Sequence, residues 1–306
     1  MLLFGILGGS FFGGTLTGWA LAQFRFPGSA WFEWALLLPL AMPAYVMAYA
    51  YTDLLQYAGP VQTALREAFG WSRGDYWFPD VRSLPGAAAM FVFTLYPYVY
   101  LLARTAFVER PPAYVEAART LGLARRRAFW RVELPLARPA IAGGIALALM
   151  ETLADFGTVA YFAVDTFTTG IYRAWFTLGD RAASAQLAAA LLGFVLVAIA
   201  LERASRGAAR SVGTGRTRAM SGDPRPWVGG WRGATIAALC AVPLVVGFAL
   251  PVALLVRLVH AEPEVAMTIR FVEWAWNSLR VAGIASAIAV VFAVLLRPTE
   301  QIVGGL

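Results

Sequence analysis

Two carboxylates lie in an apolar stretch of the chain, where a charged side chain is costly. Glu151 and Asp155 are four residues apart, so on a helix they share one face. An acid inside a bilayer is a candidate for function, and carboxylate oxygens suit a hard trivalent cation. In a second interpretation the helix breaks at Asp155, which is then solvated and caps the following element. The sequence therefore predicts an ion pathway at Glu151 and Asp155, with a purely structural position as the alternative for each.

The composition places these acids in a membrane protein. Of the 306 residues 59% are hydrophobic and 14% are charged, about half the charged fraction of an ordinary soluble domain. The mean hydropathy is +0.64, and several stretches reach the ~20 apolar residues that cross a bilayer as a helix. A disordered chain and a soluble enzyme are therefore excluded.

Missing residue types exclude further chemistry. All 25 basic residues are arginines, so the chain has no lysine for a P-loop or a Schiff base. One cysteine and one histidine exclude an intrachain disulfide and the usual Cys/His metal clusters. We expect no catalytic residues, no metal site and no bound cofactor. The net charge is +7, but the arginines lie between apolar segments. In that position they indicate membrane topology and not nucleic-acid binding.

The apolar segments predict an all-α, polytopic membrane helical bundle with about seven transmembrane helices. They lie near residues 1–22, 31–52, 87–103, 139–160, 185–201, 233–259 and 274–297. The first segment carries glycines at four-residue spacing, a pattern that lets helices pack closely in lipid. These glycines are Gly5, Gly9, Gly13, Gly14 and Gly18.

Prolines and arginines refine this bundle. Pro39 and Pro43 are expected to kink the second helix, and Pro97 the third. The connections 104–138 and 202–232 carry eight and seven arginines against three and two acids. Because arginine-rich connections stay on the cytoplasmic side, both are predicted to be cytoplasmic.

The first of these connections contains a predicted helical hairpin at residues 111–135. Pro111 and Pro112 suit the first turn of a helix, and Gly122 supplies a left-handed residue that ends it. A second short helix is expected to run until Leu134-Pro135 stops it. An amphipathic hairpin that lies on anionic lipid would have the same composition.

The spacing within this hairpin resembles the EAA loop of the permease subunits of bacterial binding-protein-dependent ABC importers. The matching residues are Glu116, Ala117, Ala118, Gly122, Leu123, Val132, Leu134 and Pro135, with valine where isoleucine is commoner. The resemblance implies a type I importer permease in the bacterial inner membrane, with a loop that couples to a separate ATP-binding subunit. The implied partners are two such subunits, which use the ATP, a periplasmic substrate-binding protein, a second permease half and the lipid bilayer.

The segments 31–45, 150–159 and 167–176 further resemble the ferric-iron permeases, whose long chains have two homologous halves. On that resemblance residues 1–201 form a first half without its leading helix, 202–232 a cytoplasmic linker and 233–306 the start of a truncated second half. The implied function is ATP-driven import of ferric iron by a transport subunit that is not itself an enzyme. Polyamine, thiamine or sulfate import remains an alternative, as does a secondary transporter driven by an ion gradient.

Overall fold

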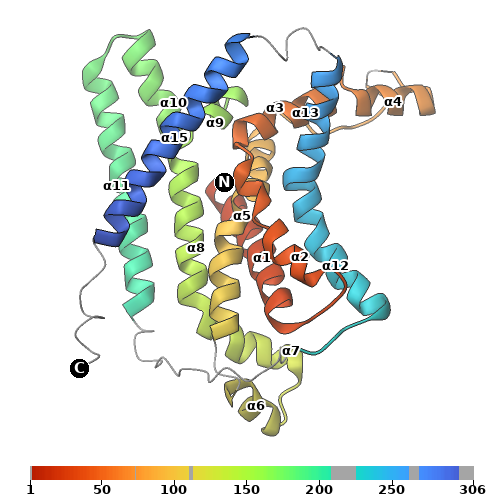
Figure 1. Ribbon diagram of the computed structural model, residues 1–306. Coiled ribbons are helices and arrows are strands. Elements are labelled where there is room, and N and C mark those ends of the chain that lie inside the picture. Colours follow the sequence, from red (N-terminus) through yellow and green to blue (C-terminus); the bar gives the residue numbers. More distant parts are fainter. Residues whose placement is uncertain (1, 73, 110–112, 208–224, 262–268, 296–306) are drawn as a thin grey trace. The chain divides into compact units, whose positions relative to one another are not determined.

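A computed structural model describes residues 2–72, 74–109, 113–207, 225–261 and 269–295 (Figure 1). Over these residues the chain is helical, and its one β-pairing is an isolated bridge between Arg25 and Trp227. The internal contacts divide the chain into two compact units, Met1–Val252 and Ala253–Leu306. The all-α fold expected from the sequence is confirmed, whereas the domain boundaries expected at residues 201 and 232 stay predictions.

Five helices in the described part are long and apolar enough to cross a membrane. They are Leu84–Glu109, Phe129–Ala154, Arg181–Ala200, Gly230–Ala261 and Arg270–Leu295. A sixth span would be the pair Ser29–Ala41 and Ala44–Phe69, which is bent by 89°. The prediction of about seven spans is higher than this count. The first segment, α1 (Leu2–Gln23), is helical as expected but is not among these five.

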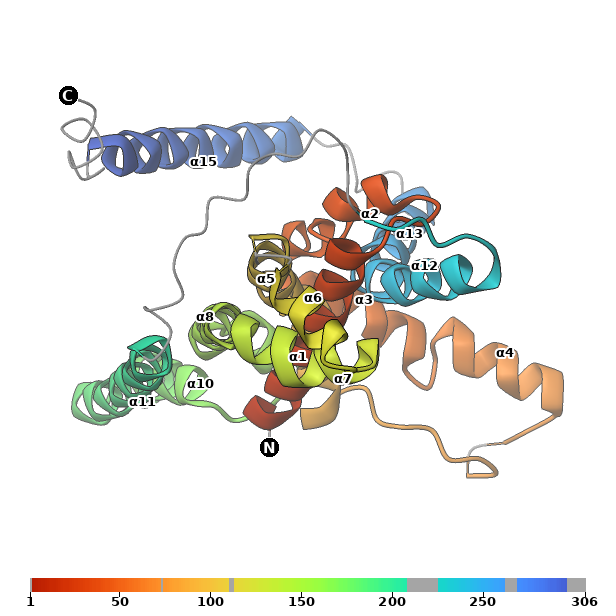
Figure 2. The same cartoon turned by 90° about the horizontal axis from the view of Figure 1, so that it is seen from below.

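Helix α5 (Leu84–Glu109) is the element on which the first unit packs. Figure 2 shows α1 and α5 from one end of the bundle, where they lie side by side. A Cβ atom on Gly14 would lie 2.7 Å from the backbone nitrogen of Tyr100, and one on Gly9 would lie 2.6 Å from Val92. The close packing predicted for the glycines of the first segment is therefore confirmed.

Helix α8 (Leu134–Ala154) approaches α5 in the same way on another side. A Cβ atom on Gly144 would lie 2.7 Å from the Cα atom of Val99. Lipid tails are as apolar as leucine, so helices in a membrane associate through this kind of close van der Waals contact.

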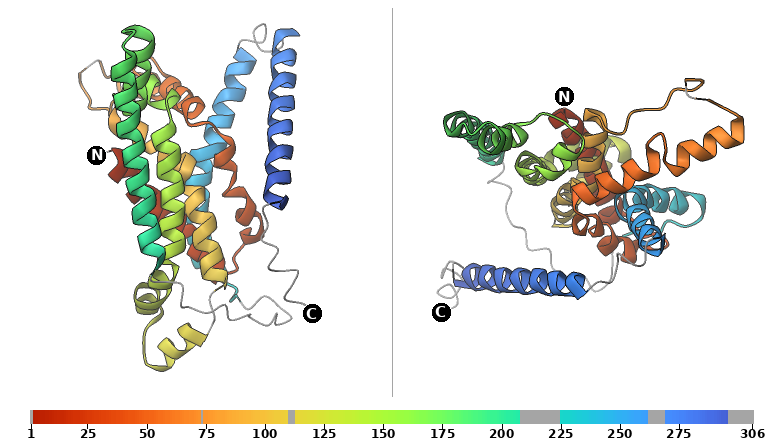
Figure 3. Two further views of the ribbon diagram at one scale, coloured as in Figure 1. Left: turned by 90° about the vertical axis from the view of Figure 1, so that its left-hand side faces the viewer. Right: turned by 90° about the horizontal axis from the view of Figure 1, so that it is seen from above.

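The prolines of the second segment break it instead of kinking it, so the single helix predicted over 31–52 is wrong. The segment forms α2 (Ser29–Ala35), the 3-10 turn η1 (Leu38–Ala41), α3 (Ala44–Leu55) and, beyond it, α4 (Pro60–Phe69). Pro39 lies in the first turn of η1, and Pro43 directly precedes α3. At the start of a helix the backbone N–H makes no hydrogen bond within the helix, so a proline is tolerated at both positions. Figure 3 shows α4 extending away from the rest of the first unit.

Pro97, in contrast, lies inside the continuous helix α5. A proline at this position cannot donate to the carbonyl of Phe93, four residues earlier. Gly247 lies against that oxygen, since a Cβ atom on Gly247 would be 2.5 Å from it. Gly247 belongs to the π-turn η4 (Val245–Ala249), between α12 (Gly230–Leu244) and α13 (Leu250–Ala261). The carbonyl of Phe93, to which Pro97 cannot donate, thus faces a neighbour that has no side chain.

The residues before α12 are fixed to α2 by an ion pair and to the end of α1 by hydrogen bonds. The Glu33 carboxylate pairs with Arg104 of α5 and with Arg225, each at 2.7 Å. The backbone of Arg25 donates to Pro226 and accepts from Val228, at 3.0 and 2.7 Å. The segment 225–228 therefore enters α12 in a defined position within the first unit.

The remaining elements complete the two units. In the first unit they are α6 (Ala113–Thr120), α7 (Arg125–Ala128), η2 (Phe129–Glu133), α9 (Gly157–Tyr161), α10 (Phe167–Tyr172), η3 (Arg173–Thr177) and α11 (Arg181–Gly207). In the second unit α15 (Ile269–Leu295) is apolar and exposed over its described side chains. A helix that is apolar on all sides needs lipid or other helices around it.

The glycine contact between α1 and α5 makes a testable prediction. Gly14→Ala places a methyl group 2.7 Å from backbone and should lower the free energy of unfolding by about 1–3 kcal/mol. Gly8→Ala on the same helix is the matched control, because no atom lies within 4 Å of the new Cβ and alanine favours the helix. Thermal unfolding in detergent should show a lower melting temperature for Gly14→Ala alone. Equal melting temperatures for the two variants would contradict the packing.

Candidate functional site

The hairpin predicted at residues 111–135 begins with a helix that ends as expected. Helix α6 ends at Thr120, and Gly122 has φ +82°, the left-handed conformation. The backbone N–H of Leu123 donates to the carbonyl of Ala118 at 3.0 Å, which is the hydrogen bond of a Schellman motif. The predicted turn at Gly122 is therefore confirmed, while Pro111 and Pro112 lie outside the described residues.

The tip of the hairpin presents small and acidic residues to solvent. Glu116, Ala117 and Gly122 are exposed, whereas Ala118 is buried where α6 packs against α7 and η2. Leu121 is 83% exposed, a large apolar side chain that the sequence reasoning did not single out. Its position one residue before a left-handed glycine is the signal that could have identified it.

The second helix of the hairpin does not stop at Leu134-Pro135, so that prediction is wrong. Helix α7 continues through the π-turn η2 directly into α8, and residues Phe129–Ala154 form one span. The N–H of Leu134 donates to Phe129, five residues earlier. A π-turn widens the helix by one residue, which accommodates the donor that Pro135 lacks. The hairpin is therefore continuous with a spanning helix.

Apolar side chains anchor this junction in the bundle. Phe129 and Leu134 are buried in a cluster with Val99 and Phe107 of α5. Val132 and Pro135 are half-buried beside them. In Figure 1 α6 and α7 lie at one end of the first unit, opposite α9 and α10. A movement of the hairpin would thus act on α5 and α8 together.

The two predicted pathway acids lie at that opposite end, in different settings. Glu151 is exposed on α8, one turn before its end. Asp155 has left the helix, and its Oδ1 accepts from the backbone N–H groups of Thr158 and Val159, at 2.9 and 3.3 Å. Its side chain therefore caps α9, as the structural alternative predicted, and it does not share a helix face with Glu151.

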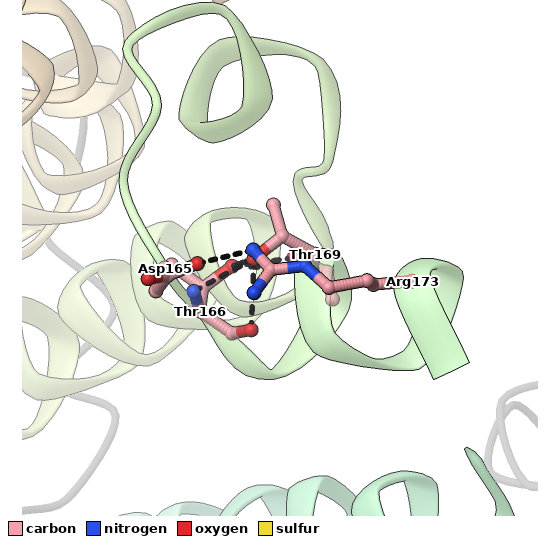
Figure 4. Close-up of polar contacts among 5 residues, drawn as sticks. Asp165, Thr166, Thr169 and Arg173 are labelled. Atoms are coloured by element: carbon pink, nitrogen blue, oxygen red, sulfur yellow. Dashed lines mark hydrogen bonds and ion pairs between the residues drawn. The ribbon is translucent and has the colours of Figure 1, made fainter. Parts of the chain in front are cut away.

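A cavity of about 590 Å³ lies beside α9 and α10. Its lining includes Phe156, Val164, Asp165, Thr169, Tyr172 and Arg173. Figure 4 shows Arg173 paired with Asp165, together with the reciprocal hydrogen bonds of Thr166 and Thr169. The ion pair measures 2.5 Å. Both charged groups are exposed, so this pair contributes little to stability. Among the described residues, no three His, Cys, Asp or Glu side chains come together as a metal site.

Comparison with known families decides what this hairpin-bearing bundle is. The family model described as "Binding-protein-dependent transport system inner membrane component" matches residues 14–210, which run from the middle of α1 to the end of α11 and include the whole hairpin. The chain belongs to this family. It is therefore an integral, multi-pass membrane component.

Three curated relatives show the range of this transport family. The sulfate transport system permease protein CysT of Salmonella typhimurium is 31% identical over 49% of this chain and 51% of its own length. The Fe(3+)-transport system permease protein FbpB 2 of Haemophilus influenzae is 26% identical, over 61% of this chain and 32% of that protein. The molybdenum transport system permease protein ModB of Escherichia coli is 28% identical, over 61% and 81%. The chain spans about half the length of the first relatives it matches.

The capping role of Asp155 in this transport component can be separated from its charge. Asp155→Ala should remove the acceptor for Thr158 and Val159, at a cost of about 1 kcal/mol, and so speed hydrogen exchange in α9 about fivefold. Asp155→Asn keeps an acceptor oxygen and should exchange like the unaltered protein. Mass spectrometry of the peptide that covers residues 156–166 measures both. Unchanged exchange in Asp155→Ala would contradict the capping role.

Proposed function

We propose that this chain is a permease subunit of an ATP-driven importer, in which it converts the movement of separate ATP-binding subunits into alternating access. One observation carries the proposal: within the matched family region, the α6–α7 hairpin extends beyond the bundle and continues without a break into α8. Exposed Glu116, Ala117 and Gly122 form its contact face, with Leu121 at the tip. Leu123, Val132, Leu134 and Pro135 position that face, and Ala118 allows α6 to approach η2 closely.

The ATP is bound and hydrolysed by the partner subunits in this proposal, and this chain holds no cofactor. The absence of lysine from the sequence supports this division, because a P-loop needs a lysine on the phosphates. Two ATP-binding subunits would need two hairpins. The second would come from a second permease half.

This chain would lie in the bacterial inner membrane. The opposite end of its bundle would receive a periplasmic substrate-binding protein. Bacterial relatives support this location. Exposed Glu151 is the first candidate to line the ion pathway there. Asp155 lies near the same entrance, but its carboxylate is engaged with α9, so its contribution is to shape the entrance.

Ferric iron is the substrate we propose, since the segments 31–45, 150–159 and 167–176 resemble ferric-iron permeases and Glu151 suits a hard cation. The second candidate is an oxyanion such as sulfate. Its support is the 31% identity to a sulfate transport permease over 150 residues.

Uptake by cells of the source organism tests the proposal, with the chromosomal gene replaced by variants. Glu116→Lys with Gly122→Val should reduce uptake of radioactive ferric iron at least about tenfold, the range typical of coupling between sites. It should also weaken co-purification of the ATP-binding subunits. The matched control is Glu67→Lys with Gly70→Val, which changes an exposed acid and another left-handed glycine (φ +65°) on α4. The control should retain the ATP-binding subunits.

The same cells distinguish the substrates. Radioactive sulfate and molybdate are measured in parallel with ferric iron, and ATP depletion should stop the uptake. Entry of sulfate in place of iron would reassign the ion to the oxyanion candidate. If deletion of the gene changed the uptake of none of the three ions, the proposed ion class would be wrong.

A further inference from the structure

A buried acid lies at the junction between the hairpin and the bundle. Glu133 is the last residue of η2 and is 2% exposed. It occupies the variable position between Val132 and Leu134 of the coupling motif. One carboxylate oxygen, Oε2, accepts from Trp19 Nε1 at 2.7 Å and from Gln23 Nε2 at 3.3 Å. Both donors come from α1, which is more than a hundred residues away in the sequence.

Such a carboxylate is expensive to bury. Desolvation of an ionised carboxylate costs several kcal/mol, and the cost is offset only when hydrogen-bond donors surround it. Trp19 and Gln23 are four residues apart and so present their donors from one face of α1. An apolar side chain at position 133 would avoid the cost of desolvation, so stability alone does not account for an acid here.

Aromatic packing closes the same junction. The Trp19 ring lies 4.9 Å from that of Phe129 and 5.4 Å from that of Phe24. Phe129 lies 6.4 Å from Phe107 of α5. Thus η2 contacts α1 through a hydrogen-bonded acid and an aromatic pair, one turn apart along the hairpin.

The position of these contacts gives them a mechanical consequence. The glycines of α1 hold it against α5 at backbone distance, so α1 and α5 move as one body. The hairpin is already covalently continuous with α8. A bond from η2 to α1 therefore joins the hairpin to a second spanning element, through side chains that can be exchanged without breaking the chain.

We propose that Glu133 is a positioning residue for coupling, which holds the hairpin to α1 through Trp19 and Gln23 so that its movement rotates α1, α5 and α8 together. This inference rests on the proposed function, because it assigns a role within the same hairpin. Without these hydrogen bonds between Glu133 and α1, ATP hydrolysis continues while the π-turn takes up the movement of the hairpin.

The test measures ions transported per ATP hydrolysed by the assembled transporter in liposomes. Glu133→Leu should lower this ratio at least about fivefold with ATPase activity retained, and Glu133→Gln should lower it less, because its amide oxygen still accepts from Trp19. Trp19→Phe combined with Glu133→Leu should be no worse than Glu133→Leu alone, since both remove one interaction. Glu109→Leu, an exposed acid at the same end of the bundle, is the matched control and should keep the ratio of the unaltered protein.

Folding is monitored through Cys240, the single cysteine, which is fully buried. It should remain unreactive to a maleimide in every variant that is scored. If Glu133→Leu exposes Cys240, then Glu133→Gln and Trp19→Phe, which remove less, carry the test. An unchanged ratio of ions transported to ATP hydrolysed in the folded variants would contradict the positioning role of Glu133. Absence of ATP-dependent uptake by the unaltered protein would instead contradict the proposed function.

Discussion

Close backbone contact with α5 is the constraint on which the other helices of the first unit depend. Burial from water does not drive helices together inside a bilayer, so they need surfaces that approach to van der Waals distance. Gly14 of α1 and Gly144 of α8 provide such surfaces on two sides of α5. Gly247 provides a third, against the Phe93 carbonyl to which Pro97 cannot donate. Larger residues at any of these positions would separate the helices and loosen the bundle.

The second feature is how the hairpin joins this bundle. Pro135 would ordinarily end a helix, but η2 absorbs the missing hydrogen bond and lets α7 run into α8. A π-turn is an i→i+5 turn inside an α-helix and is frequent at functional sites, so the junction is continuous but is not a regular α-helix. Phe129, Leu134 and Glu133 then fix it to α5 and α1. Contacts of one turn with two helices of the bundle suit an element that, in the proposed function, passes on movement.

Local signals in the sequence were sufficient for part of this structure. Gly122 was predicted because only a left-handed residue ends α6 at that point, and the glycine spacing of the first segment predicted its packing. Pro39 and Pro43 were recognised as breaks of hydrogen bonding, but the sequence does not say whether a proline kinks a helix or begins a new one. That outcome depends on whether neighbouring elements can fill the gap.

The rest depended on tertiary contacts. Burial of Glu133 requires Trp19 and Gln23, whose proximity follows only from the packing of α1. The π-turn that begins at Phe129 is five residues long, and over so short a stretch the sequence pattern of a π-turn does not differ from that of an α-helix. The sequence allows Asp155 to be a pathway acid or a helix cap. In the structure its carboxylate accepts from the first turn of α9 and therefore caps that helix. The pattern of the hairpin carries no information on the proposed ion, because in the proposed function its face is directed to a partner subunit.

Photo-crosslinking from the tip of the hairpin tests the central claim most directly. A photoreactive residue at Leu121, which is 83% exposed, is compared with one at Trp77, which is 85% exposed and lies outside the hairpin. In membranes of the source organism, Leu121 should crosslink to a protein with a P-loop sequence, identified by mass spectrometry, and the yield should change when ATP is added. Trp77 should not crosslink to that protein. Equal crosslinking from both positions, or none from Leu121 to a P-loop protein, would contradict the assignment of the hairpin as the coupling element.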